Sequence, residues 1–225
     1  MEPDRQAVIS QLADLICAVE CSHPLRVAID GVDAAGKTML ADELVVPLQT
    51  MGRVVIRASV DGFHNPRTVR YQRGADSPEG YYRDSFNHGA ILRAVLNPLG
   101  PDGNRKIRRT GFDFRADEPT NQLRIEVPEV AILLFDGVFL WHPTLKSYWD
   151  FLIFVEVDFN ISIARAVARD VQDSPGDLNS QVVQDRYNRR YVPGQQIYFN
   201  EAQPKNFADV IFENNDIDHP NLIIK

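Results

Sequence analysis

One segment near the start of the chain, residues 31–38, has the residue types and spacing of a phosphate-binding loop. It contains Gly-Val-Asp-Ala-Ala-Gly-Lys-Thr and fits the pattern G-x-x-x-x-G-K-[ST] at every fixed position. Glycines in such a loop let backbone N–H groups close around phosphate oxygens without Cβ clashes. A plain glycine-rich turn would need neither Lys37 nor Thr38. We therefore expect Lys37 to reach the β- and γ-phosphates of a nucleoside triphosphate and the Thr38 hydroxyl to ligate Mg²⁺.

The loop lies between two elements that suit this role. Residues 25–29 form an apolar run typical of a buried strand, and residues 38–44 have the pattern of a helix. The positive end of that helix adds to the anion site. The expected nucleotide contacts are the residues of the loop and the residue that follows it, namely Gly31, Asp33, Ala34, Ala35, Gly36, Lys37, Thr38 and Met39.

Two carboxylates follow predicted strands, at the strand ends where ligands of an open α/β sheet bind. Asp136 follows the apolar run 130–135, and Asp61 follows the predicted strand 53–60. We expect Asp136 to hold Mg²⁺, the plainer alternative being an Asp-Gly turn. We expect Asp61 to accept the proton of an attacking hydroxyl, the alternative being a cap on the next segment. His64 is a weaker candidate in the same loop.

Strand and helix patterns alternate along the chain, which favours an α/β fold with a mostly parallel sheet and helices on both faces. Five strands are expected, at residues 25–29, 53–60, 130–135, 151–157 and 208–212. The short stretches 106–109 and 123–127 are expected to pair as an antiparallel hairpin. Further helices are expected at 90–96, 161–171 and 178–191, with a breaker cluster at 174–176 and a helix end at Pro193 and Gly194. No long linker interrupts the pattern, so we predict one domain over residues 1–225.

Composition limits the classes of partner. The net charge of −7 argues against a dedicated nucleic-acid binder. Residues 64–124 nevertheless carry eleven Lys and Arg against seven Asp and Glu, a surplus that either attracts an anionic substrate or forms a solvated face. No apolar stretch approaches the roughly 20 residues that span a bilayer. Residues 8–19 are amphipathic rather than signal-like, so we expect a cytoplasmic protein without a membrane partner.

The two cysteines, Cys17 and Cys21, lie on or just after the first predicted helix. A zinc site needs further Cys or His ligands nearby, and His23 alone does not supply them. We therefore expect both cysteines to be core or surface thiols.

The chain resembles the uridine kinase branch of the P-loop family that also contains phosphoribulokinase and bacterial-type pantothenate kinase. The likeness is carried, in order, by residues 31–38, Val-Asp-Gly-Phe at 60–63, Phe-Asp-Phe at 112–114, Leu-Phe-Asp-Gly-Val at 134–138, and Arg-Ala-Val-Ala-Arg-Asp at 165–170. The resemblance implies a three-layer P-loop NTPase fold with a hairpin insertion at about 104–127 and a helical lid at about 165–190. It also implies ATP, Mg²⁺ and a small-molecule hydroxyl acceptor, and it leaves open whether the protein is a homo-oligomer.

The resemblance assigns roles to individual residues. It implies that Asp61 is the catalytic base and that Arg165 and Arg169 clamp the phosphates, Arg169 and Lys37 sharing in catalysis. Positions four apart share one helix face, so both arginines could reach one polyphosphate, although a solvated face is the alternative. The acceptor is expected to contact residues from the second strand end, the segment before residue 90 and the hairpin, namely Asp61, Phe63, His64, Tyr82, Arg83, Asp84, Phe112 and Phe114.

Two departures leave the acceptor open. Uridine kinases usually have Tyr at the start of the hairpin element and His five residues later, where this chain has Phe112 and Asp117. Losing those hydrogen-bonding groups should weaken recognition of a pyrimidine. The leading hypothesis is a kinase for a nucleoside such as uridine or cytidine. The alternatives are a kinase for a sugar, a sugar phosphate or pantothenate, and a regulatory module that hydrolyses or senses ATP.

Overall fold

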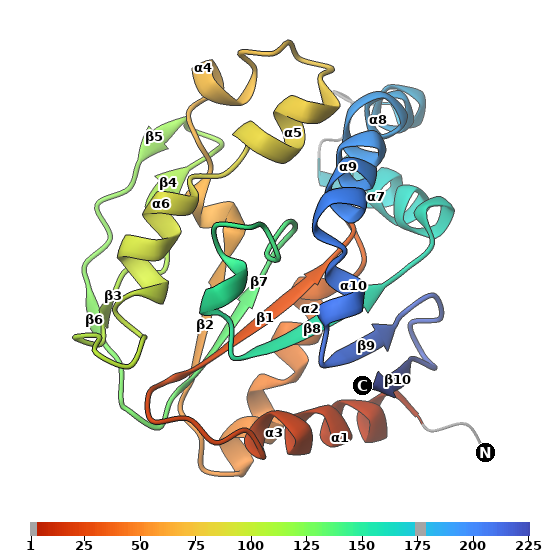
Figure 1. Cartoon of the computed structure of the whole chain (residues 1–225). Coiled ribbons are helices and arrows are strands. Elements are labelled where there is room, and N and C mark those ends of the chain that lie inside the picture. Colours follow the sequence, from red (N-terminus) through yellow and green to blue (C-terminus); the bar gives the residue numbers. More distant parts are fainter. Residues whose placement is uncertain (1–3, 174–178) are drawn as a thin grey trace.

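The computed structural model describes residues 4–173 and 179–225, and a six-stranded sheet forms its centre (Figure 1). The strand order is β10-β9-β8-β1-β7-β2. The strands that pair in parallel are β1 (Leu25–Gly31), β2 (Val55–Ser59), β7 (Ile132–Asp136), β8 (Phe151–Glu156) and β9 (Val210–Glu213). These are the five strands that the sequence predicts.

The expected number of strands is wrong by one. β10 (Asn221–Ile224) adds an antiparallel edge strand to β9. Most of its residues are exposed, so it lacks the continuous apolar burial that marks β1 and β7. Burial against the core is what makes a strand visible in a sequence, and an edge strand has little of it.

Helices cover both faces of the sheet, as expected for three layers (Figure 1). On one face, α1 (Arg5–Cys17), α2 (Lys37–Glu43) and α3 (Val45–Thr50) pack against the sheet through side chains such as Leu12 and Leu40. On the other face lie α5 (Pro78–Asp84), α6 (His88–Ile91) and α9 (Val192–Ala202). The remaining helices are α4 (Arg67–Arg70), α7 (Phe159–Asp173), α8 (Ser180–Arg186) and α10 (Pro204–Phe207). No helix within the described ranges is long and apolar enough to cross a membrane.

The helix predicted over 178–191 does not end at Pro193 and Gly194. After α8 it passes through a π-helical turn (Tyr187–Tyr191) and continues as α9 to Ala202. Pro193 lies in the first turn of α9, directly after the π-helical turn. A Cβ at Gly194 would lie 2.8 Å from the carbonyl oxygen of Pro78, so this glycine permits close packing of α9 on α5. The breaker cluster at 174–176 lies outside the described residues.

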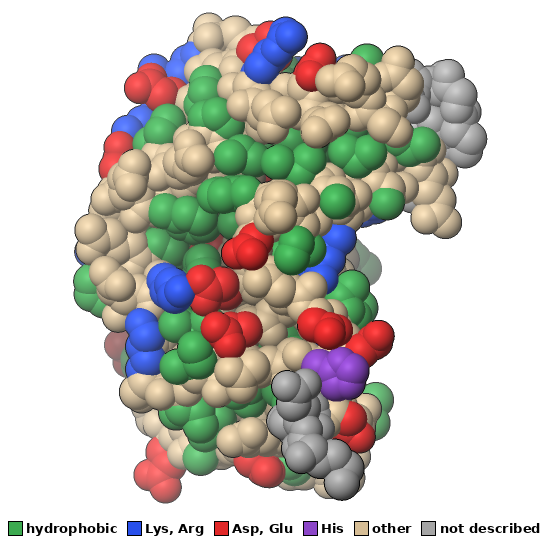
Figure 2. All heavy atoms as spheres, turned by 90° about the vertical axis from the view of Figure 1, so that its right-hand side faces the viewer, with side chains coloured by type: hydrophobic (Ala, Val, Ile, Leu, Met, Phe, Trp, Pro, Cys, Tyr) green, Lys and Arg blue, Asp and Glu red, His purple; other side chains and the backbone are tan. Residues whose placement is uncertain are grey.

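Figure 2 shows the side of the molecule on which α8 and α9 lie. Hydrophobic side chains gather in the upper half of this view, and more of the charged side chains lie in the lower half.

The predicted hairpin is present but its strands are short. β3 (Lys106–Ile107) pairs antiparallel with β6 (Ile125–Glu126), and β4 (Phe112–Asp113) pairs with β5 (Glu118–Pro119). The Gly111 N–H and the Thr110 hydroxyl both donate to the Gly62 carbonyl oxygen, at 2.8 and 3.1 Å. These bonds fix the insertion beside the turn that follows β2.

A pair of histidines joins α6 to the loop after β7. The rings of His88 and His142 have centroids 4.1 Å apart, and His142 also contacts the Tyr82 ring. Burial, together with the neighbouring His142, lowers the pKa of His88 from 6.5 to about 4. The folded state therefore binds this proton more weakly than the unfolded chain does.

This difference predicts a loss of stability in mild acid. As the pH falls from 6.5 towards 4, the unfolded chain takes up a proton that folded His88 refuses, so the unfolding free energy should fall by on the order of 2–3 kcal/mol. Urea unfolding at pH 7, 5.5 and 4 measures it. His88→Gln should make the unfolding free energy depend less on pH. His219→Gln, at an exposed position, should leave this pH dependence unchanged. The prediction would be contradicted if the unfolding free energy of His88→Gln fell with pH as steeply as that of the unchanged protein.

Candidate active site

A cavity of about 640 Å³ opens at the carboxyl ends of β1, β7 and β2, where the phosphate-binding loop leads from β1 into α2. It brings together residues that are far apart in the sequence. The sequence-predicted residues that line it are Asp33, Ala34, Gly36, Lys37, Thr38, Met39, Asp61, His64, Phe114, Asp136, Arg165 and Arg169. Gly31 and Ala35 belong to the loop without lining the cavity.

The loop conformation requires its glycines. Gly31 has φ +149° and Gly36 has φ +94°, which L side chains adopt rarely. A Cβ at Gly31 would lie 2.4 Å from the Val155 carbonyl oxygen, so the loop runs against the end of β8. Asn214, which follows β9, donates to the Ala35 carbonyl oxygen at 2.7 Å. Sequence reasoning missed Asn214 because nothing local links it to the loop.

Lys37 is a buried cation surrounded by carboxylates. Its Nζ donates to the carbonyl oxygens of Val32 and Gly31, at 2.6 and 3.1 Å. Burial lowers the pKa of Lys37, and the negative charges of Asp33, Asp30 and others act in the opposite direction. An ammonium group has three donors, so one N–H of Lys37 is left for a phosphate oxygen.

Asp136 is held from two sides. The Thr38 hydroxyl donates to its Oδ2 at 2.8 Å, and the Arg57 guanidinium on β2 donates to its Oδ1 at 2.9 Å. The adjacent hydroxyl and carboxylate are hard oxygen donors of the kind that Mg²⁺ prefers, so the residues present fit this ion. Sequence reasoning missed Arg57. The only local signal of its role is that a charged residue interrupts an apolar strand.

Asp61 and His64 occupy the turn after β2. Asp61 lies in the 3₁₀ turn Val60–Phe63 and lines the cavity. His64 Nδ1 donates to the Asp61 carbonyl oxygen at 2.9 Å, and its ring lies between Phe86 and Phe114, with centroids at 4.6 and 4.9 Å. Burial lowers the pKa of His64 below 6.5, so the ring is neutral at pH 7. This end of the cavity is therefore aromatic with one carboxylate.

Both predicted lid arginines reach the cavity from α7. Arg165 donates through Nη2 to the Asn215 carbonyl oxygen at 2.8 Å, and its buried Nη1 has no hydrogen-bond partner among the described residues. Arg169 contacts Asp170 at 2.9 Å and the Tyr187 hydroxyl at 3.3 Å. Arg190, in the π-helical turn after α8, donates to loop carbonyl oxygens such as that of Ala75 and does not line the cavity.

Tyr81 and Gln195 hold the phosphate loop from the opposite face of the cavity. The Tyr81 hydroxyl donates to Asp33 Oδ2 at 2.7 Å. Gln195 Nε2 donates to the same oxygen at 3.2 Å, and its Oε1 accepts from the Asp33 N–H at 2.8 Å. Burial raises the pKa of Asp33, and the Lys37 charge partly offsets this. The sequence analysis assigned neither residue to the site.

Several expected acceptor contacts do not line the cavity. Phe63 stacks on Phe135 in the core, and Phe112, on β4 of the hairpin, is buried. Tyr82 packs on Phe139 and Tyr198.

The two charged candidates on α5 are paired elsewhere. Arg83 pairs with Glu201 at 2.5 Å and Asp84 with Arg73 at 2.7 Å. The phase of α5 explains this, because it turns Tyr81 towards the phosphate loop and residues 82–84 to other faces. Nearby aromatic residues that do line the cavity are Tyr81 and Phe86.

Asp117, where uridine kinases usually have a histidine, has an internal role. It accepts from the Arg67 N–H at 2.9 Å and from the Arg70 guanidinium at 2.9 Å. It therefore joins the hairpin to α4 and does not line the cavity.

Comparisons with known proteins agree with this geometry. No family model matches the chain. Uridine-cytidine kinase B of Dictyostelium discoideum is 24% identical over 190 residues, covering 84% of this chain and 74% of the relative. A uridine kinase of Proteus mirabilis is 28% identical over 196 residues, covering 82% and 84%.

Solved structures share the fold. One described as a possible uridine kinase from Bacillus stearothermophilus has a TM-score of 0.70 at 20% identity, covering 90% of this chain and 96% of that one. A D-glycerate 3-kinase from Cryptococcus neoformans has a TM-score of 0.65 at 12% identity, covering 97% and 99%. The chain is therefore similar in sequence to proteins named uridine kinase, and it shares its fold with solved kinase structures.

Proposed function

We propose that the protein is an ATP-dependent kinase that transfers the γ-phosphoryl group to a hydroxyl of a nucleoside such as uridine or cytidine. The observation that carries the proposal is one cavity with two chemically different ends. One end has the phosphate loop and two arginines, and the other has Asp61 beside aromatic rings. Relatives named uridine kinase support the same reaction class.

The donor end binds and neutralises the triphosphate. Lys37 and the loop N–H groups contact phosphate oxygens, and Arg165 and Arg169 approach from α7. Thr38 and Asp136 would hold Mg²⁺, which neutralises phosphate charge when bound. Arg57 keeps the Asp136 carboxylate oriented for that role. Such positioning and electrostatic stabilisation supply most of the rate in phosphoryl transfer.

Asp61 is the proposed base. Its carboxylate takes the proton of the acceptor hydroxyl as the acceptor oxygen bonds to the γ-phosphorus. The bond between the γ-phosphorus and the β,γ-bridging oxygen breaks, and ADP leaves with that electron pair. Asp61 follows β2 and Asp136 ends β7, which are neighbouring parallel strands. The base therefore lies at the same sheet edge as the metal ligands.

The acceptor end favours a neutral, flat molecule. Among the described residues lining the cavity, the cations are Lys37, Arg165 and Arg169, all on the phosphate loop or α7. Arginines of the basic region 64–124 are engaged elsewhere, for example Arg70 with Asp117. The exposed ring of Phe114 offers a face on which a base can stack. The competing acceptors are a sugar, a sugar phosphate and pantothenate.

The cytoplasmic location expected from the sequence stays a prediction.

Replacing the proposed base should stop transfer without stopping nucleotide binding. We expect Asp61→Asn to lower kcat by about 10²–10⁴-fold, the usual contribution of a positioned acid–base group. A coupled ADP assay with uridine measures the rate, and calorimetry measures ATP affinity. Glu118→Gln, an exposed carboxylate change on β5, should leave both unchanged. Near-normal activity in Asp61→Asn would remove Asp61 as the base.

Replacing the loop lysine should weaken the donor end. Lys37→Ala removes the buried cation that faces the phosphates, so we expect most activity to be lost. The same coupled assay checks this, with the exposed Lys146→Ala as control. Retained activity in Lys37→Ala would contradict the phosphate-loop assignment.

Replacing Phe114 by alanine should weaken binding of the acceptor and leave ATP binding unchanged. Stacking of a base on an aromatic side chain contributes about 1–3 kcal/mol, so Phe114→Ala should raise the KM for the nucleoside about tenfold or more and leave the KM for ATP unchanged. Phe207→Ala, at an exposed position outside the cavity, is the control.

An acceptor panel tests the class of substrate directly. ADP release should depend on an added acceptor and be fastest with pyrimidine nucleosides. Preference for a sugar phosphate or pantothenate would select the competing kinase hypothesis. Acceptor-independent ADP release would select the regulatory module.

A further inference from the structure

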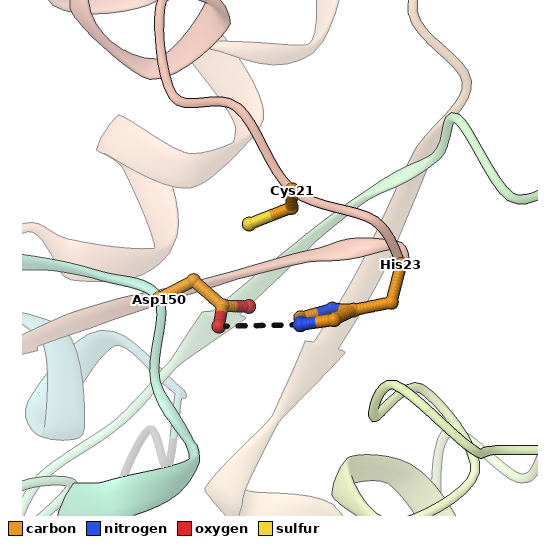
Figure 3. A group of neighbouring side chains, drawn as sticks. All are labelled: Cys21, His23 and Asp150. Carbon is orange, nitrogen blue, oxygen red and sulfur yellow. Dashed lines mark ion pairs between the residues drawn. The ribbon is translucent and has the colours of Figure 1, made fainter.

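A second group of chemically reactive side chains lies away from the cavity. Ligand atoms of Cys21, His23 and Asp150 all lie within 4.8 Å of one another (Figure 3). Cys21 and His23 belong to the connection between α1 and β1, and Asp150 directly precedes β8. Because β1 and β8 are parallel, the group lies at the amino ends of both strands. The phosphate loop lies at the other end of β1, about 23 Å away for seven residues at roughly 3.3 Å each.

We propose that Cys21, His23 and Asp150 form a zinc-binding site. Thiolate, imidazole and carboxylate are the ligands that zinc takes in proteins. Cys21 is exposed, whereas His23 and Asp150 are partly buried, so the site is open to solvent on the cysteine side. A water molecule can complete four-coordination from that side.

The imidazole is oriented for metal binding. His23 Nδ1 lies 3.1 Å from the Pro24 carbonyl oxygen, which can only accept, so Nδ1 carries the proton. The lone pair of Nε2 then faces the other two side chains. Histidine ligands of metals commonly have their second ring nitrogen fixed in this way.

The distances need little adjustment. His23 Nε2 lies 3.8 Å from Asp150 Oδ1. Two ligands on a tetrahedral zinc, with bonds of about 2.0–2.2 Å, lie about 3.3–3.5 Å apart. The donors lie up to 4.8 Å apart, and rotation of the exposed Cys21 side chain with small shifts of His23 and Asp150 would bring them into range.

Arg26 orients the Asp150 carboxylate and leaves it able to bind a metal ion. It donates from Nε and its backbone N–H to Asp150 Oδ2, at 2.9 and 2.8 Å, and from Nη2 to Oδ1 at 2.7 Å. A carboxylate oxygen has two lone pairs, so Oδ1 retains one for a metal. The guanidinium repels a cation, and we therefore expect weaker binding than at a site of four cysteine and histidine ligands.

The same geometry excludes a nucleophilic triad. In a Cys-His-Asp relay, histidine bridges the thiol and the carboxylate through its two ring nitrogens. Here Nδ1 of His23 is bonded to a backbone carbonyl, so only Nε2 faces both partners. Zinc binding uses this one nitrogen, and a relay needs two.

Cobalt titration of the full chain tests the site. Metal is first removed with a chelator, and Co²⁺ is then added without nucleotide or Mg²⁺. We expect one equivalent to give the visible bands of tetrahedral cobalt and the near-ultraviolet sulfur-to-cobalt band, and Zn²⁺ to abolish both. Zinc should also raise the thermal unfolding midpoint, because the folded state holds the three ligands together and binds zinc more tightly than the unfolded chain does.

Variants locate the ligands. Cys21→Ser should abolish the sulfur-to-cobalt band and weaken zinc binding by more than about tenfold, as should His23→Gln through loss of its nitrogen. Cys17→Ser, the matched control on α1, should keep the full signal. Zinc binding unchanged in Cys21→Ser, a signal that follows Cys17, or no thiolate band at saturating cobalt would each overturn the proposal. Zinc that persists in Cys21→Ser and is displaced by MgATP would instead occupy the Thr38–Asp136 pair and also overturn it.

Discussion

Parallel pairing of three strands is the constraint on which the rest of the site depends. β7 pairs with β1 on one side and with β2 on the other, and Asp136 is in register with both Ile29 and Ser59. Parallel strands end at one edge, so the phosphate loop, the proposed base and the proposed metal ligand meet there. A shift of β7 by one residue would turn Asp136 to the opposite face of the sheet and separate it from Thr38.

The electrostatics of the site follow from this convergence. Lys37 faces several carboxylates, among them the fully buried Asp30, whose side chain accepts from the Tyr198 hydroxyl and the Gly31 N–H. Burial raises the pKa of Asp30, so keeping this carboxylate charged beside the lysine costs free energy. Arginines on α7 add positive charge from outside the sheet. The carbonyl oxygens of Gly31 and Val32 hold the Lys37 ammonium in place, and the surrounding carboxylates favour its charged form.

Local patterns in the sequence predicted the parts of this structure that depend on local physics. The phosphate loop requires particular residues at fixed spacing, and buried strands such as β7 require apolar runs, so both are visible in a single sequence. The exposed edge strand β10 and the helix that continues past Pro193 depend on neighbours instead. The expected acceptor contacts also depend on neighbouring elements, because the packing of α5 decides that Tyr81 rather than Tyr82 faces the phosphate loop. Asp150 joins Cys21 and His23 only through the pairing of β1 with β8.

The continuous helix formed by α8, the π turn and α9 has a mechanical consequence. Gln195 on this helix contacts Asp33 of the phosphate loop, and Arg190, less than two turns away, holds the backbone at Arg70 and Gly74. A tilt of this helix would strain one of these contacts. The helix therefore couples the position of the phosphate loop to that of the segment around Arg70 and Gly74.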